Sequence, residues 1–251
     1  AIDFGPAKNL SDLSKVAATL MYQELLRGWK PVAGKINLAG LLPALEPAKL
    51  PVTEAIRLLL NRGRGLLMAG DKLSRGDGDQ DFIVRNMHKS LLGSGDALLL
   101  AAGQYAWRSE ERLEKFRELA AAYELPGEFV AGYREACQYK LEPTPYLPQN
   151  PWEFLRQCQR CWLRAVQITA SAEDSSPEAV MEGLHRSARR HSSFRQFLRW
   201  TIRARAFRKP RFSCDQPVVT VLGMLYPTLL TAPPPAPPIL PELFRLWQLF
   251  N

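Results

Sequence analysis

Two apolar stretches of this chain carry polar side chains inside otherwise continuous helical patterns. Asn61 and Arg62 lie within LLLNRGRGLLMAG, and Lys89 and Asp96 lie within KSLLGSGDALLLAAGQY. Lys89 and Asp96 are seven residues apart, so a helix places them two turns apart on roughly one face. Polar groups on a core helix cost free energy unless they have partners. We therefore expect a polar seam in a helical bundle, in which Asp96 and Lys89 are partly buried and bond to Asn61, Arg62 or each other.

The strongest charge feature is a basic segment at residues 185–212. It holds ten Lys and Arg residues and no acid, enough to account for the net charge of +8. Arg195, Arg199 and Arg203 are spaced four apart and form one stripe on a helix, where like charges repel each other. A phosphate-bearing partner, a nucleotide or RNA, would relieve this repulsion. The alternative is that the stripe faces solvent or pairs with acidic helices at 110–118 and 124–135.

Within the basic segment, Arg186 and His191 have side chains that could act together on RNA. His191 could serve as general base toward a ribose 2′-hydroxyl while Arg186 holds the phosphate. Their spacing, an Arg and a His with four residues between them, resembles the R-x4–6-H motif of HEPN helical domains. Some of these domains are ribonucleases, and they are often found beside minimal nucleotidyltransferases. The HEPN pattern prefers an amide, an acid or a His directly after the Arg, and this chain has Ser187 there.

The first half of the chain resembles the helical region that follows the catalytic domain in nucleotidyltransferases of the DNA polymerase β superfamily. The resemblance is carried by Leu58-Leu-Leu-Asn61-Arg62, Phe82-Ile-Val followed by Lys89, Gly95-Asp96-Ala97-Leu98-Leu99, and then Gly103, Tyr105 and Arg108. It implies a helical, substrate-facing part of such an enzyme, with an N-terminal catalytic domain missing from this chain.

The acids that hold the metal in that superfamily have no clear counterpart here. They form an Asp-x-Asp/Glu pair on a strand about a dozen residues after a Gly-Ser pair, and they bind the Mg²⁺ that bridges the nucleotide phosphates. No such strand follows Gly93-Ser94, and no Gly-Ser precedes Asp79-Gln80-Asp81. Asp3, within the strand-like Ile2-Asp3-Phe4, could be the third carboxylate, or this stretch could be a frayed terminus. We therefore expect no metal site in this chain, and Mg²⁺ and a nucleoside triphosphate only with the full-length enzyme.

A C-x-x-C pair, Cys158 and Cys161, is the remaining candidate for metal or redox chemistry. A zinc site needs a second close pair of Cys or His, and none is present. The pair also lies inside a helix that begins with Asn150 as N-cap, Pro151 at the first position and Glu153 at the third. We expect these cysteines to pack in the core. The chain also has no Walker loop, G-x-S-x-G or H-E-x-x-H motif.

No apolar run reaches transmembrane length, because glycine, serine and Asp96 interrupt residues 91–102. No signal-peptide pattern is present, and four cysteines in a chain of 251 residues favour reduced thiols. The sequence therefore predicts a cytoplasmic protein without a membrane partner.

The hydrophobic periodicity is almost wholly helical. It predicts a mainly α fold, a multi-helix bundle with at most a short strand element near the N-terminus. The expected helices lie at 11–26, 53–68, 81–102, 109–123, 127–140, 151–169, from 177, 193–209, 216–230 and 241–250. The proline-rich loop EPTPYLPQN suggests a boundary between a region at 1–141 and a second helical bundle at 151–251, which carries the basic helix and a polyproline II connector, TAPPPAPPILP.

Three functions remain open at this stage. The first is the helical, substrate-facing portion of a nucleotidyltransferase, inactive as this chain alone. The second is a HEPN-like RNA-binding or ribonuclease domain, and the third is a helical interaction domain without chemistry. The first two predict a nucleotide or RNA as partner.

Overall fold

The structure is a computed structural model that describes residues 9–15, 19–31, 34, 37–189 and 217–230. Its helices in chain order are α1 (Leu20–Gly28), α2 (Val52–Ser74), α3 (Gln80–Ala101), α4 (Ser109–Ala122), α5 (Gly127–Leu141), α6 (Pro151–Ala170), α7 (Pro177–Arg189) and α9 (Pro217–Leu230). Three short 3-10 turns, Leu10–Lys15, Leu38–Gly40 and Pro47–Lys49, flank α1. The described ranges contain no strand, which confirms the mainly helical fold class. The possible strand at residues 2–4 and the predicted helices at 193–209 and 241–250 lie outside these ranges.

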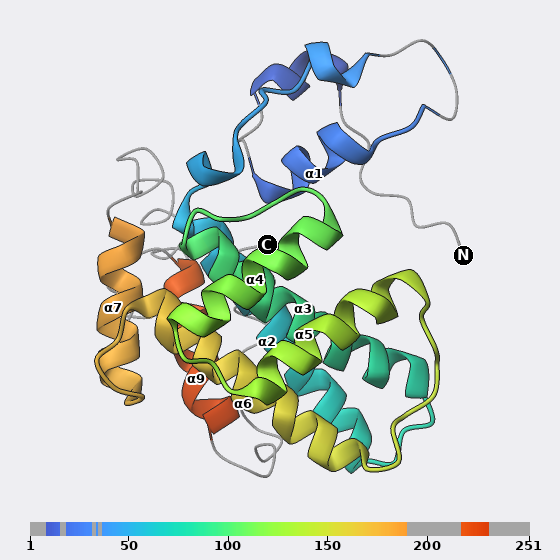
Figure 1. The fold of residues 1–251 in the computed structure, drawn as a ribbon, viewed down its shortest axis with the longest axis vertical. Helices are drawn as coiled ribbons and strands as arrows, with labels where there is room; N and C mark the ends of the chain where they lie inside the picture. The colour runs from blue at the N-terminus through green and yellow to red at the C-terminus, as the bar shows by residue number, and fades with distance from the viewer. Residues whose placement is uncertain (1–8, 16–18, 32–33, 35–36, 190–216, 231–251) are drawn as a thin grey trace, which may run out of the picture.

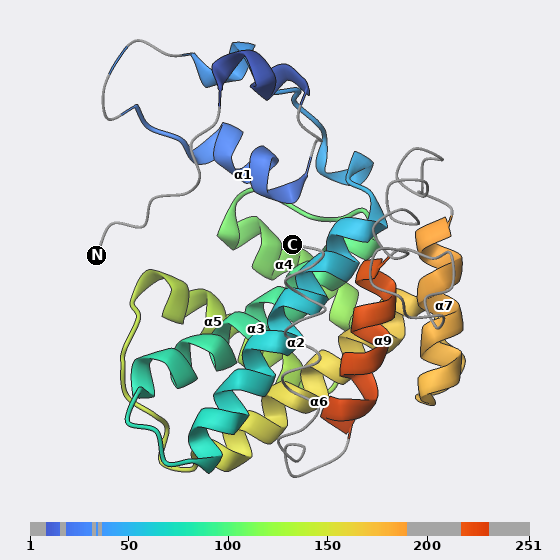
Figure 2. The ribbon, with the colours of Figure 1, turned by 180° about the vertical axis from the view of Figure 1, so that it is seen from behind.

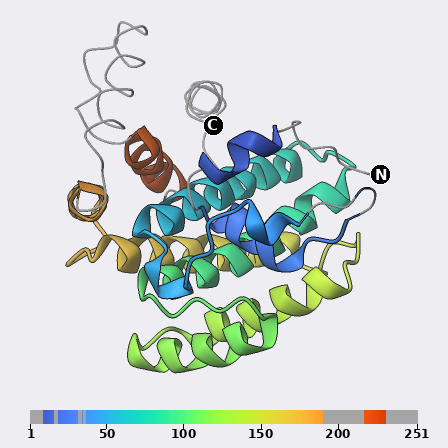
Figure 3. The ribbon, with the colours of Figure 1, turned by 90° about the horizontal axis from the view of Figure 1, so that it is seen from above.

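The long helices α2 and α3 form the centre of the bundle (Figure 1). In the view from above, α4 and α5 lie on one side of this pair and α9 lies on the other (Figure 3). Figure 2 shows α9 beside α2, and α7 packs in turn against α9 and α6. One apolar core runs through the bundle, from Leu50 to Leu229. Residues on both sides of the loop at 142–150 contribute to this core, and the division at that loop stays a prediction.

Helix termini follow the capping chemistry of the sequence at two places. Asp79 accepts a hydrogen bond from the backbone N–H of Phe82 (3.2 Å) at the start of α3. Asn150 accepts one from the backbone N–H of Glu153 (3.2 Å) at the start of α6, with Pro151 in the first turn as predicted. These caps fix where α3 and α6 begin.

The N-terminal segment differs from the single helix predicted at 11–26. It holds a 3-10 turn at Leu10–Lys15 and then α1, which begins at Leu20 with Thr19 as its N-cap. This segment has a small apolar cluster of its own around Leu13, Leu38 and Leu42. This segment projects from the bundle in Figure 1. Its helix α1 contacts the bundle through Glu24, which accepts a hydrogen bond from Tyr105.

None of the described helices combines the length and the apolarity that crossing a bilayer requires.

Candidate functional site: a polar cavity between α1, α2, α3 and α5

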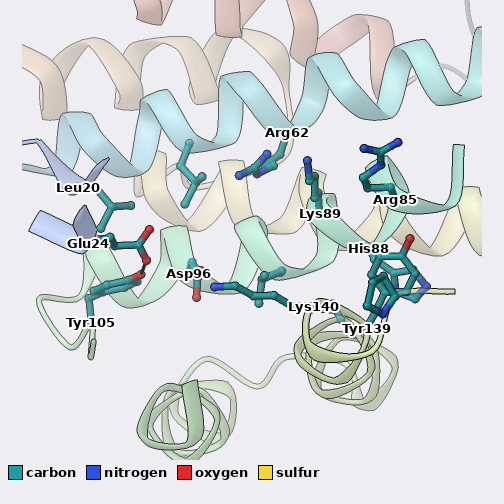
Figure 4. A pocket seen from close by; sticks show the side chains of 14 residues that line it. Leu20, Glu24, Arg62, Arg85, His88, Lys89, Asp96, Tyr105, Tyr139 and Lys140 are labelled. Carbon is teal, nitrogen blue, oxygen red and sulfur yellow. Dashed lines mark hydrogen bonds between the residues drawn. The ribbon is translucent and has the colours of Figure 1, made fainter. Parts of the chain in front are cut away.

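A cavity of about 300 Å³ opens where α1 meets the central helices. Nine of the fourteen residues that line it have polar side chains (Figure 4). They come from α1 (Glu24), α2 (Arg62), α3 (Arg85, His88, Lys89 and Asp96), the turn after α3 (Tyr105) and α5 (Tyr139 and Lys140). Leu20, Leu58, Leu92, Ala136 and Pro143 supply the apolar lining. The helical periodicity of α3 places its four polar residues on one side of that helix.

At one end of the cavity, Asp96 is the centre of a buried hydrogen-bond network. Its Oδ2 accepts a hydrogen bond from Arg112 Nη1 (3.0 Å), and its Oδ1 accepts one from the Tyr133 hydroxyl (2.7 Å). Desolvation raises the pKa of the Asp96 carboxyl, and Arg112 and the Tyr133 hydroxyl oppose that rise. Both carboxylate oxygens are therefore occupied by structural partners.

The network continues from Asp96 to the helix α1. Arg112 also donates to the Tyr105 hydroxyl, which in turn donates to Glu24 Oε1 (2.6 Å). Arg112 and Tyr105 are almost fully buried, whereas the Glu24 side chain is 46% exposed. Burial is the largest single influence on the pKa of Arg112 and lowers it, but Asp96, Tyr105, Tyr133 and Glu24 together outweigh burial, so the pKa is raised. The network thus fixes α1 against α3 and α4 at the edge of the cavity.

The other end of the cavity carries a group of cations. Figure 4 places Arg62, Lys89 and Arg85 side by side along α2 and α3. Arg85 is paired with Asp81, one turn earlier on α3. Desolvation lowers the pKa of Arg62, and the acids Asp96 and Glu24 counteract this. Desolvation also lowers the pKa of Lys89, and the charges of Arg62 and Arg85 lower it further.

An aromatic pair, His88 and Tyr139, closes the cavity beside these cations. Their rings are stacked, with centroids 4.1 Å apart and planes 13° from parallel. Phe154 contacts the same imidazole with a centroid distance of 5.0 Å. His88 Nδ1 and the Tyr139 hydroxyl are buried and have no hydrogen-bond partner. This end of the cavity therefore combines positive charge with flat rings and unused polar atoms.

His88 makes a testable contribution to the pH dependence of stability. Desolvation lowers its pKa from 6.5 to about 4. Between these values the unfolded chain binds a proton that the folded chain does not, so stability falls as the pH falls through this window. We expect the parent to lose roughly 2 kcal/mol more than His88→Phe on going from about pH 7.5 to about pH 5.

Urea unfolding of both proteins at the two pH values measures this difference. Phenylalanine keeps the ring contacts with Tyr139 and Phe154, so the comparison isolates the titration. The carboxylate of Glu135, 4.0 Å from His88 Nε2, can reduce the effect by pairing with a charged imidazole. Equal pH dependence in the two proteins would show that His88 does not resist protonation in the folded state.

The structure places the four residues of the predicted polar seam on α2 and α3. Asp96 is buried and Arg62 is half-buried, and both line the cavity. The partners of Asp96 are Arg112 and Tyr133, from α4 and α5, in place of the predicted bonds to α2 or to Lys89. Lys89 lines the cavity and is exposed, where it was expected to be partly buried. Asn61 is half-buried on α2 and lies outside the cavity lining.

Four members of the network were not among the site residues predicted from the sequence: Glu24, Tyr105, Arg112 and Tyr133. The burial of Arg112 could have been predicted from the sequence, because it precedes Phe116 by one helical turn and Leu119 by two on the same face of α4. A charged residue on such a face needs a buried partner.

The remaining predicted site residues divide into two groups. Asp3, His191, Arg195, Arg199 and Arg203 lie outside the described residues. Arg186 is exposed near the end of α7 and pairs with Glu182 (3.1 Å), one turn earlier.

The acids and cysteines considered for metal binding have other roles. Asp79 caps α3 and lies 3.4 Å from Lys72, and Asp81 pairs with Arg85. Cys158 and Cys161 are buried in the core as expected, and desolvation raises the pKa of both thiols, for Cys161 to about 12. Across the described part of the chain, no group of three or more His, Cys, Asp or Glu side chains could hold a metal ion.

Comparison with known proteins gives one partial likeness. No family model and no solved structure matches the chain. The chain is 28% identical over 177 residues to the DNA replication and repair protein RecF of Synechococcus sp. (strain JA-3-3Ab). The alignment covers 70% of this chain and 42% of that protein, so the chain spans less than half the length of this relative.

Proposed function

We propose that the described helices form the helical, substrate-facing portion of a nucleotidyltransferase, and that the polar cavity receives its nucleotide. The observation that carries this proposal is the concentration of Arg62, Arg85, Lys89 and Lys140 around one cavity. Its volume of about 300 Å³ lies at the lower end of the range for small-molecule sites. Phosphate groups are the common anions that Arg and Lys clusters bind.

The pairing of charges within the cavity supports an anionic ligand. Asp96 is neutralised by Arg112, and the charge of Arg85 is balanced by Asp81. The charges of Arg62 and Lys89 have no ion-pair partner among the described residues, and Glu24 lies at the opposite end beside Tyr105 (Figure 4). A ligand with negative charge at the cation end would complete this arrangement.

Calorimetric titration of the chain with ATP, CTP, GTP and UTP tests the proposal. Leu92→Trp is the informative variant, because Leu92 is a half-buried leucine of the cavity lining and an indole there would fill the space. Leu113→Trp is its matched control, a half-buried leucine of α4 that does not line the cavity. The proposal expects one or more nucleotides to bind to the parent and Leu113→Trp, and none to bind to Leu92→Trp. No binding to the parent, or equal binding to both variants, would contradict it.

The chain alone is expected to transfer no nucleotide. Transfer in this superfamily needs carboxylates that hold Mg²⁺ against the phosphates, and the described residues offer no cluster that could do so. Incubation with labelled nucleoside triphosphates, Mg²⁺ or Mn²⁺ and candidate acceptors measures this directly. Metal-dependent labelling of an acceptor by the pure chain would overturn the expectation.

Nucleic-acid binding is a second candidate function, with two observations in its favour. One is the basic segment at 185–212, and the other is the partial likeness to a DNA replication and repair protein.

Under this proposal DNA or RNA binds to the Arg195, Arg199 and Arg203 stripe, and the affinity falls steeply as salt rises. Fluorescence anisotropy with labelled DNA and RNA at two salt concentrations tests it. Arg195→Glu with Arg199→Glu should abolish binding and leave the thermal melt unchanged.

The HEPN alternative predicts, in addition, that the same segment cleaves RNA. His191→Ala must remove ribonuclease activity while RNA binding is kept, because His191 is the general base and Arg186 the phosphate contact in that reading. Cleavage that persists in His191→Ala, or its absence from the parent, leaves nucleic-acid binding or a helical interaction domain without chemistry.

A further inference from the structure

Arg62 and Lys89 face the same part of the cavity from two different helices. Arg62 projects from the middle of α2, and Lys89 projects from α3 beside it (Figure 4). No hydrogen bond or ion pair joins either side chain to another described residue, and Arg62 Nε is buried without a partner. A buried N–H that lacks a partner costs roughly 1–3 kcal/mol, more when the group is charged. Two neighbouring cations with unused donors therefore favour an anion between them.

The position of Arg62 depends on Gly93 of α3. A Cβ added at residue 93 would lie 2.5 Å from Arg62 Cγ, 2.9 Å from Nε and 3.0 Å from Cδ. The aliphatic part of Arg62 thus occupies the space that any other side chain at position 93 would take. This contact holds the guanidinium beside Lys89.

We propose that Arg62 and Lys89 form an anion subsite for a pyrophosphate-type group of the ligand, with Gly93 as the positioning residue for Arg62. The inference rests on the proposed nucleotide function and names the part of the cavity that binds the phosphates. Arg62 supplies several N–H donors in a planar fork, and Lys89 supplies a compact charge, a combination that suits adjacent phosphate oxygens.

Inorganic pyrophosphate and ATP are the probes that test this subsite. Each is titrated by calorimetry into the parent, Arg62→Gln, Lys89→Gln and Gly93→Ala. Arg75→Gln is the charge control, because Arg75 is exposed, pairs with Asp71 and does not line the cavity. Gly65→Ala is the packing control: its added Cβ would lie 2.6 Å from Asn86 Oδ1 at the same α2–α3 contact, away from the lining.

Arg62→Gln and Lys89→Gln should each weaken pyrophosphate and ATP binding by roughly tenfold or more, the range for hydrogen bonds to charged groups. Gly93→Ala should weaken both several-fold, while Arg75→Gln and Gly65→Ala bind as the parent does. Thermal melts of all variants establish that each is folded. Pyrophosphate binding that is unchanged in Arg62→Gln and Gly93→Ala, or absent from the parent, would overturn the subsite.

The two proposals fail in different ways. Arg62-dependent binding of pyrophosphate with no binding of ATP supports the subsite and contradicts the nucleotide function. ATP binding that is blocked by Leu92→Trp but insensitive to Arg62→Gln and Lys89→Gln overturns the subsite and leaves the nucleotide function standing.

Discussion

Replacing Asp96 by Ala is expected to lower the free energy of unfolding by roughly 3–5 kcal/mol, the range for breaking a buried ion pair. The loss follows from what remains: Arg112 would keep its charge in the interior without the carboxylate that now accepts its hydrogen bond. The Tyr133 hydroxyl would also lose its acceptor. Denaturant unfolding of the parent and variant at neutral pH gives the value.

Asp81→Ala is the matched control for this prediction. Asp81 belongs to the same helix and also pairs with an arginine, Arg85, but both side chains are about half exposed. Exposed ion pairs contribute roughly 0–1 kcal/mol, so Asp81→Ala should unfold close to the parent. If Asp96→Ala has the same denaturant midpoint as Asp81→Ala, the buried network does not stabilise the fold.

Trp162→Ala is expected to cost roughly 3–5 kcal/mol as a large-to-small substitution in the core. Trp162 on α6 is fully buried, and its indole N–H donates to the backbone carbonyl of Leu59 on α2 (2.9 Å). Its ring lies over Gly63, where any added Cβ would overlap it. The variant would therefore leave a large void between α2, α6 and α9.

Trp162→Phe separates the two contributions of the indole. Phenylalanine refills much of the void but cannot donate to Leu59, so its loss should be well below that of the Ala variant. Chemical denaturation of both variants provides the comparison. An Ala variant no less stable than the Phe variant would contradict the packing of Trp162 against α2.

The helices were predictable because their signals are local. Periodicity placed α3 at 81–102, and the structure has it at Gln80–Ala101. The end of α2 was misjudged: the predicted helix ended at 68, but the helix continues to Ser74, with Gly70 buried inside it. A glycine within a helix costs about 1 kcal/mol relative to Ala, and packing against a neighbour can outweigh that amount.

The partners within the site were not predictable from spacing. Asp96 could be expected to need a partner, but Arg112 reaches it only because the chain reverses direction between α3 and α4. Tyr133 reaches it because Gly95 leaves room for the tyrosine ring against α3. Both contacts join different helices, and residue spacing within one helix gives no information about which other helix packs against it. The same limit explains why Glu24 was missed.

The most direct test of the nucleotide cavity is the ¹H–¹⁵N resonance of Arg62 Nε during a titration with ATP. Arg62→Gln identifies this resonance by its disappearance, and the Nε–H of Arg75, which lies outside the cavity, serves as an internal reference. Because Arg62 Nε belongs to the guanidinium and has no partner in the free protein, a phosphate bound by that guanidinium should shift its resonance. We expect a saturable shift at Arg62 with the dissociation constant measured by calorimetry, and an unmoved signal at Arg75. An Arg62 resonance that stays in place when ATP saturates the protein would contradict nucleotide binding in this cavity.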